Sequence, residues 1–131
     1  MKGKQHVYVA SNKIKYDITL NRNITIIKGD SGTGKTRLIN LIELATSSSK
    51  SRLVKFESTK PCLAISRKDN NWRFTIENHP GYIIFIEEDT VPVESTEFKE
   101  VIDGADNYFV IVTRYPLYNI PYKVDEILFN V

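Results

Sequence analysis

Cysteine, histidine and long apolar segments are all scarce in this chain of 131 residues. The one cysteine, Cys62, excludes an internal disulfide and a cysteine zinc cluster, and a total of two histidines argues against a histidine metal site. No apolar run approaches the roughly 18 residues that a membrane helix needs. The opening segment, residues 1–13, also lacks the apolar core of a signal peptide. We therefore expect a cytoplasmic protein with no membrane association.

The remaining composition is that of an ordinary globular domain. Apolar residues make up 41% and charged residues 26% of the chain, and the length suits a single domain over residues 1–131. Residues 1–86 carry a balance of +9, whereas residues 87–131 carry −7. This asymmetry fits scattered solvated charge, or a basic face that meets a nucleic acid or an acidic partner. Aromatic and basic residues do not interleave in a pattern that would stack nucleic-acid bases.

Residues 29–36, GDSGTGKT, match the phosphate-binding pattern G-x-x-x-x-G-K-[ST]. They follow the apolar run NITIIK and precede RLINLIELA, which is the strand, loop and helix context of that motif. Glycines let the backbone approach a phosphate, and the start of the helix offers unpaired N–H groups. The residues predicted to bind the nucleotide are Gly29, Asp30, Ser31, Gly32, Thr33, Gly34, Lys35, Thr36 and Arg37. Lys35 is expected to reach the β and γ phosphates, and Thr36 to coordinate a bridging Mg²⁺.

Apolar periodicity divides the rest of the chain into short elements. Alternating residues predict an N-terminal β-hairpin within residues 1–20, and apolar residues at helical spacing predict a helix behind the motif. Three strands bounded by turn residues are then predicted at RLVKFES, PCLAIS and NWRFTIE, the last two forming a strand insert at residues 60–77. A further helix is expected to end at Gly104.

A second landmark is YIIFIEED, residues 82–89, in which acids directly follow an apolar strand. Such a strand delivers carboxylates to the crevice where open α/β sheets bind ligands. The segment resembles the Walker B strand of P-loop ATPases that have an additional strand and a catalytic glutamate. This resemblance implies that Glu87 holds Mg²⁺ through water and that Glu88 is the general base, although the family has Asp-Glu at these positions. A shift of one residue would give the two roles to Glu88 and Asp89, and the structural alternative is a solvated acidic turn.

The segment YFVIVTR, residues 108–114, is expected to form another strand. In the resembled class this strand lies between the Walker A and Walker B strands, and it would place Thr113 and Arg114 beside the γ phosphate. Arg114 can stabilise charge on the transferred phosphate or pair with the nearby acids, and both roles stay open. The tail KVDEILFNV is expected to supply the last strand. The C-terminal segment also resembles the ends of short stand-alone ATPase-like proteins from mobile elements.

We therefore expect an α/β three-layer P-loop NTPase fold. The resemblance implies a mostly parallel core sheet in the order 5-1-4-3-2, with antiparallel edge strands from residues 1–20 and 60–77. The predicted function is binding of ATP and Mg²⁺ with slow hydrolysis, as a conformational switch on a protein or nucleic-acid partner. Whether the chain forms an oligomer is left open by the sequence. The predicted catalytic residues are Lys35, Glu88 and Arg114.

Three alternatives to an ATPase switch remain. They are a nucleotide-binding module that does not hydrolyse, a small-molecule kinase, and an inhibitor protein of a mobile element that reuses the fold. The sequence has no LSGGQ-like signature, which argues against a complete transporter-type ATPase. It also has no NKxD motif, so guanine specificity has no support.

Overall fold

The chain folds as a mixed α/β protein. The structure, a computed structural model, describes residues 4–28, 35–47, 49, 51–114, 117 and 125–128, with the backbone alone for residues 35, 36 and 125–128. Within that part no helix is long and apolar enough to cross a membrane. Its elements are β1 (Gln5–Ala10), β2 (Lys15–Leu20), β3 (Ile24–Lys28), α1 (Lys35–Thr46), the 3-10 turn η1 (Ser51–Leu53), β4 (Lys55–Ser58), β5 (Cys62–Ile65), α2 (Trp72–Glu77), β6 (Ile83–Glu87), α3 (Thr96–Gly104), β7 (Tyr108–Thr113) and β8 (Asp125–Leu128).

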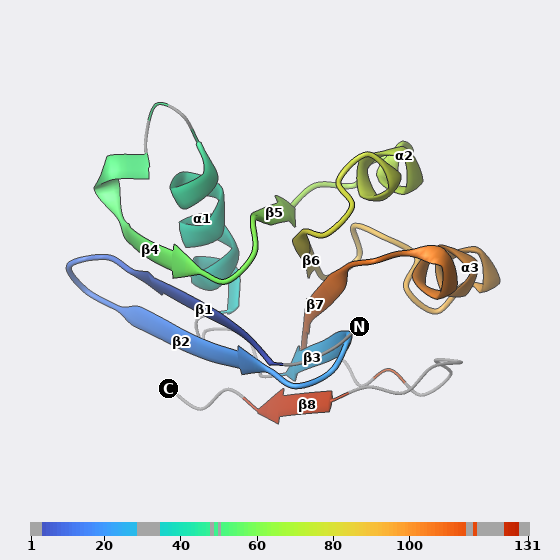
Figure 1. The fold of residues 1–131 in the computed structure, drawn as a ribbon, viewed down its shortest axis with the longest axis horizontal. Helices are drawn as coiled ribbons and strands as arrows, with labels where there is room; N and C mark the ends of the chain where they lie inside the picture. Colours follow the sequence, from blue (N-terminus) through green and yellow to red (C-terminus); the bar gives the residue numbers. More distant parts are fainter. Residues whose placement is uncertain are drawn as a thin grey trace.

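Five strands form a parallel sheet in the order β5-β6-β7-β3-β8. When only these strands are numbered along the chain, the order is 5-1-4-3-2 from the β8 edge, as expected. The strand from YFVIVTR, β7, lies between β3 and β6 (Figure 1). The three central strands β3, β6 and β7 are buried along almost their whole length, which suits a parallel sheet covered on both faces.

The register brings the ends of β3, β6 and β7 to one edge of this sheet. Lys28 at the end of β3 pairs with Thr113 of β7. Glu87 at the end of β6 pairs with Val112 of β7, so Glu88 follows at the level of Thr113. The chain therefore enters residues 29–34 at the same carboxyl edge where the acids of β6 leave the sheet.

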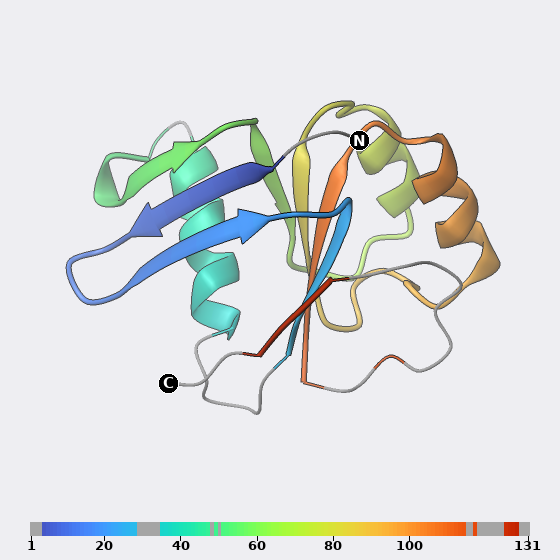
Figure 2. The same cartoon turned by 60° about the horizontal axis from the view of Figure 1, so that its bottom comes forward.

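The N-terminal hairpin is confirmed. Strands β1 and β2 pair antiparallel from Gln5 opposite Leu20 to Ala10 opposite Lys15, and the Ser11 N–H donates to the Ile14 carbonyl at 2.8 Å across the turn. β4 adds to the other side of β1, giving a three-stranded sheet in the order β2-β1-β4. Figure 2 shows this sheet in front of α1, on the opposite side of the molecule from α2 and α3.

Two apolar cores cover the two faces of the parallel sheet. The first joins the antiparallel sheet, α1 and one face of the parallel sheet, and it buries Leu38, Ile39 and Ile42 of α1 completely. The second lies between the opposite face and the helices α2 and α3 (Figure 1). In this second core the Phe98 ring lies 5.9 Å from Trp72 and 5.7 Å from Phe109, between ring centroids. Helix α1 thus packs on one face of the parallel sheet, and helices α2 and α3 pack on the other.

Residues 72–77 form the helix α2, so the strand predicted there is wrong. Trp72 and Ile76 are buried and four residues apart, which places them on one face of a helix, while Phe74 is 67% exposed. A helix between β5 and β6 makes a crossover connection, and such connections join parallel strands. β5 accordingly pairs parallel with β6. Residues 60–77 are therefore not an antiparallel insert, and β4 is the third strand of the antiparallel sheet.

Candidate functional site at the carboxyl edge of the parallel sheet

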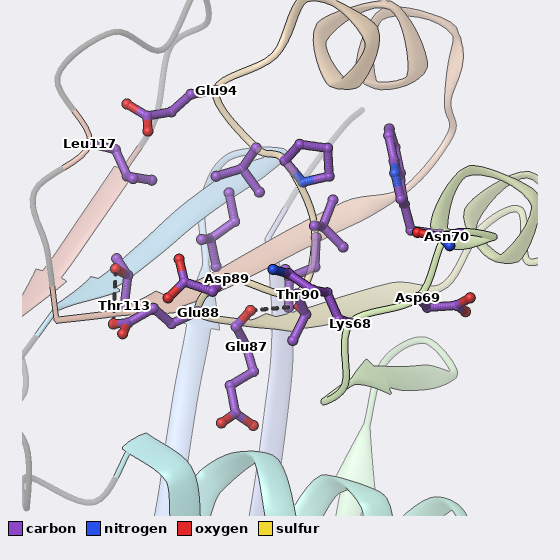
Figure 3. A pocket seen from close by; sticks show the side chains of 16 residues that line it. Lys68, Asp69, Asn70, Glu87, Glu88, Asp89, Thr90, Glu94, Thr113 and Leu117 are labelled. Carbon is purple, nitrogen blue, oxygen red and sulfur yellow. Dashed lines mark hydrogen bonds between the residues drawn. The ribbon is translucent and has the colours of Figure 1, made fainter.

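The acids that follow β6 leave the sheet in different directions. Figure 3 shows the Glu87 side chain pointing toward α1 and the Glu88 side chain pointing toward Thr113. Asp89 is exposed and has a φ of 64°, in the left-handed region that Asp adopts more readily than most residues. The Thr90 hydroxyl donates to the Glu87 carbonyl at 2.6 Å and so closes the turn. The three adjacent acids therefore have three different environments.

Glu88 is held by the end of the neighbouring strand. Its Oε1 accepts hydrogen bonds from the Arg114 N–H at 2.6 Å and from the Thr113 hydroxyl at 3.3 Å. The Arg114 Nε lies 3.2 Å from Glu88 Oε2. The sequence left two roles open for Arg114, and this arrangement shows the pairing with an acid. Glu88, Thr113 and Arg114 are therefore neighbours at the ends of adjacent strands.

Glu87 lies among like charges on the α1 side. Burial raises the pKa of this carboxyl above its usual value, and the negative charges of Glu43 and Glu88 raise it further. Glu43 is itself fixed by the Ser66 hydroxyl, which donates to Glu43 Oε2 at 2.6 Å. A cation beside Glu87 would relieve this repulsion. In the described part of the chain no three His, Cys, Asp or Glu side chains are grouped closely enough to hold a metal ion.

Most of the predicted phosphate site lies outside the described residues. This holds for residues 29–34 and for the side chains of Lys35 and Thr36. The flanking elements are as predicted, because β3 ends at Lys28 and α1 begins at Lys35. Arg37 is exposed, and its charge opposes the rise that burial causes in the pKa of Tyr16 on β2. Arg37 therefore lies toward the antiparallel sheet.

A pocket of about 680 Å³ opens beside the acids, between the loop after β5 and the loop after β6 (Figure 3). Trp72, Ile86 and Ile111 contribute apolar side chains to it, and Lys68 extends into it from the loop after β5. This pocket was not predicted, because residues 60–77 were expected to form an antiparallel strand insert. A crossover helix at Trp72 would have been the signal, since it brings the β5 and β6 loops to one edge.

Comparisons of the chain with protein-family models, with curated proteins and with solved structures each gave no match. The function is therefore argued from the sheet edge, the motif that enters it and the side chains around it.

Proposed function

We propose that the protein is a P-loop NTPase of the additional-strand class, which binds ATP with Mg²⁺ at the carboxyl edge of its parallel sheet and hydrolyses it slowly. One observation carries the proposal. GDSGTGKT connects β3 to α1, and the acids of β6 leave the same edge with only β7 between. Neighbouring strands lie about 4.8 Å apart, so the ends of β3 and β6 are separated by about 10 Å. A phosphate-bound Mg²⁺ at one strand end can then meet a carboxylate at the other through water.

The residues at this edge have the chemistry that a nucleotide with Mg²⁺ requires. Backbone N–H groups of residues 29–36 and the Lys35 ammonium would bind the phosphates. The Thr36 hydroxyl and Glu87 would hold Mg²⁺, a hard cation that takes oxygen ligands. When bound, the ion would supply charge neutralisation at the β and γ phosphates. Burial raises the pKa of Glu87, the negative charges of Glu43 and Glu88 raise it further, and a bound cation would offset that repulsion.

Glu88 would be the general base that orients the attacking water. A base needs a carboxylate oxygen free to accept the proton, yet both oxygens of Glu88 are engaged by Arg114, with Thr113 adding to one of them. This arrangement supports slow turnover until a partner, a protein or a nucleic acid, draws Arg114 away. The same observation favours the second candidate function, a module that retains nucleotide without hydrolysing it.

Phosphate release and nucleotide retention, measured on the same sample, test this proposal. The purified chain is incubated with ATP or GTP, with and without Mg²⁺. We expect ATP to be retained and phosphate to appear slowly and only with Mg²⁺. Retention with no phosphate release would replace the ATPase by the binding module. If the chain is incubated with saturating ATP or GTP and neither nucleotide remains with it on gel filtration, the proposed nucleotide site is wrong.

A further inference from the structure

The pocket beside β6 combines an apolar floor with a charged rim. Trp72, Ile86 and Ile111 form this floor, and each of these side chains is no more than 7% exposed. It opens on the face of the sheet that α2 and α3 cover, whereas the segment 29–34 connects to α1, which packs on the opposite face. With a volume of about 680 Å³ the pocket is in the range of small-molecule sites.

The charge around this pocket is predominantly negative. Five acidic residues and one lysine line it, and the acids are Asp69, Glu87, Glu88, Asp89 and Glu94. The Glu87 carboxylate itself points away from the pocket, toward α1 (Figure 3). Glu88 is compensated by Arg114, and Asp69 Oδ1 accepts a hydrogen bond from the Asn71 N–H at 2.8 Å.

Two acids on the loop after β6 remain without such compensation. Asp89 and Glu94 are exposed, and no ion pair within the described residues involves either of them. Such a rim repels a phosphate and attracts a cation. The rim formed by Asp89 and Glu94 therefore favours a cationic occupant.

We propose that this pocket binds a cationic nitrogen carried on an apolar stem, either a free organic amine or the Lys or Arg side chain of a protein partner. The stem would contact Trp72 and Ile86 on the floor, where apolar area leaves water. The cation would lie at the rim beside Asp89 and Glu94. Lys68 on the facing loop opposes the cation and so limits its affinity. The inference does not rest on nucleotide binding, although the proposed nucleotide site shares Glu88 with the lining of this pocket.

Trp72 makes this proposal measurable without a label. It is the only tryptophan in the chain, and it lines the pocket, so a change in tryptophan fluorescence reports the occupied pocket. The probe is n-hexylammonium, with 1-hexanol and hexanoate as neutral and anionic controls of the same stem. We expect the ammonium to shift the emission at concentrations where the alcohol shifts it less and the carboxylate not at all.

Charge variants test whether the rim selects the cation. Asp89→Asn and Glu94→Gln each remove one rim charge, and each is expected to weaken hexylammonium binding about two- to fivefold, the range for exposed ion pairs. Asn also tolerates the positive φ at position 89. Lys68→Gln should strengthen binding by a similar factor. Asp106→Asn is the matched control, because this exposed acid lies before β7, at the amino end of the sheet, and does not line the pocket.

The source of the cation is distinguished with a capped Ala-Leu-Arg-Leu-Ala peptide and its citrulline analogue. Tighter binding of the arginine peptide than of hexylammonium assigns the pocket to a protein side chain, and tighter binding of hexylammonium assigns it to a free amine. Equal responses to hexylammonium, hexanol and hexanoate would overturn the proposal. So would an affinity for hexylammonium unchanged in the Asp89→Asn, Glu94→Gln double variant, provided that its circular dichroism and thermal unfolding match the wild type.

Discussion

Arg114 contacts Glu88 twice, and only one of the two contacts depends on the Arg114 side chain. The backbone N–H donates to Glu88 Oε1 at 2.6 Å, while the guanidinium Nε lies 3.2 Å from Oε2. Any side chain at position 114 keeps the first contact. Substituting Arg114 therefore frees Oε2 of Glu88, while the hydrogen bond to Oε1 remains. Such a variant can distinguish whether Arg114 pairs with the acid or acts on the transferred phosphate.

Arg114→Ala is expected to raise ATP hydrolysis severalfold, because it frees the Oε2 of the proposed base. Its cost in folding free energy should stay below about 1 kcal/mol, since the ion pair is half exposed. The measurement is steady-state phosphate release, with urea denaturation for stability. Arg73→Ala is the matched control, as Arg73 pairs with Glu77 and Glu97 instead of with Glu88. A fall in turnover would show that Arg114 acts on the transferred phosphate.

Glu88→Gln is expected to leave ATP binding intact and to lower hydrolysis by about 10²- to 10⁴-fold, the usual effect of losing a general base. Gln still offers an oxygen to the Arg114 N–H and the Thr113 hydroxyl, so the local structure should persist. Single-turnover kinetics on the loaded protein measure the chemical step. If Glu88→Gln hydrolyses at the wild-type rate and Asp89→Asn does not, the base is Asp89 and the assignment is wrong by one residue.

Glu87→Gln should change the pH dependence of stability. The folded state holds the Glu87 proton more tightly than the unfolded chain, so stability falls as pH rises from the ordinary value of 4.5 to the raised folded pKa. The variant lacks this loss. Its free energy of unfolding should therefore exceed that of the wild type at pH values above this interval, and should show no such advantage at pH values below it. Urea denaturation across this pH range tests the sign, and Glu57→Gln on β4 controls for the change in net charge. An advantage confined to the acid side would refute the assignment.

Ser95 caps the helix that flanks the pocket. Its Oγ accepts a hydrogen bond from the Phe98 N–H at 3.1 Å and donates one to the Pro92 carbonyl at 2.7 Å. Ser95→Ala should cost about 1 kcal/mol of folding free energy, as is typical for a lost N-cap. Ser95→Thr keeps the hydroxyl and should cost much less. Equal midpoints for the two variants in urea would show that the cap contributes nothing.

The long apolar patterns predicted the sheet well. Strands β3, β6 and β7 are continuous apolar runs, and such runs suit buried parallel strands. The helix α3 ends at Gly104, as predicted. Runs of five or six residues are too short for periodicity alone, so the three strands were indicated by their continuous apolar character and by the residues that flank them.

The short segment at residues 72–77 could not be decided in the same way. Trp72 and Ile76 share one face in a strand as well as in a helix, so only the middle residue, Phe74, distinguishes the two. A strand with Trp72 and Ile76 on its buried face would bury Phe74 as well, and Phe74 is exposed. With a helix at residues 72–77 the connection from β5 to β6 is a crossover, and Lys68 and Trp72 of this connection line the pocket.

The side-chain arrangement at the site was only partly predictable. Adjacency of Glu88 to Thr113 and Arg114 followed from the implied strand order, because neighbouring parallel strands end at the same edge. The direction in which each carboxylate points was not accessible from sequence, since it depends on the turn at Asp89 with its positive φ. Glu43 was missed as well, because its position beside Glu87 depends on how α1 crosses the sheet.

The central claim is that residues 29–36 bind a nucleotide's phosphates, and calorimetric titration of ATP with Mg²⁺ tests it most directly. Wild type is compared with Lys35→Ala and with Lys55→Ala, which removes an exposed lysine from β4 of the antiparallel sheet. We predict saturable heat for wild type and Lys55→Ala, and a clear loss of affinity for Lys35→Ala, because a charge-assisted contact to phosphate is lost. Equal affinity in all three proteins, or no binding by a folded wild type, would contradict the account.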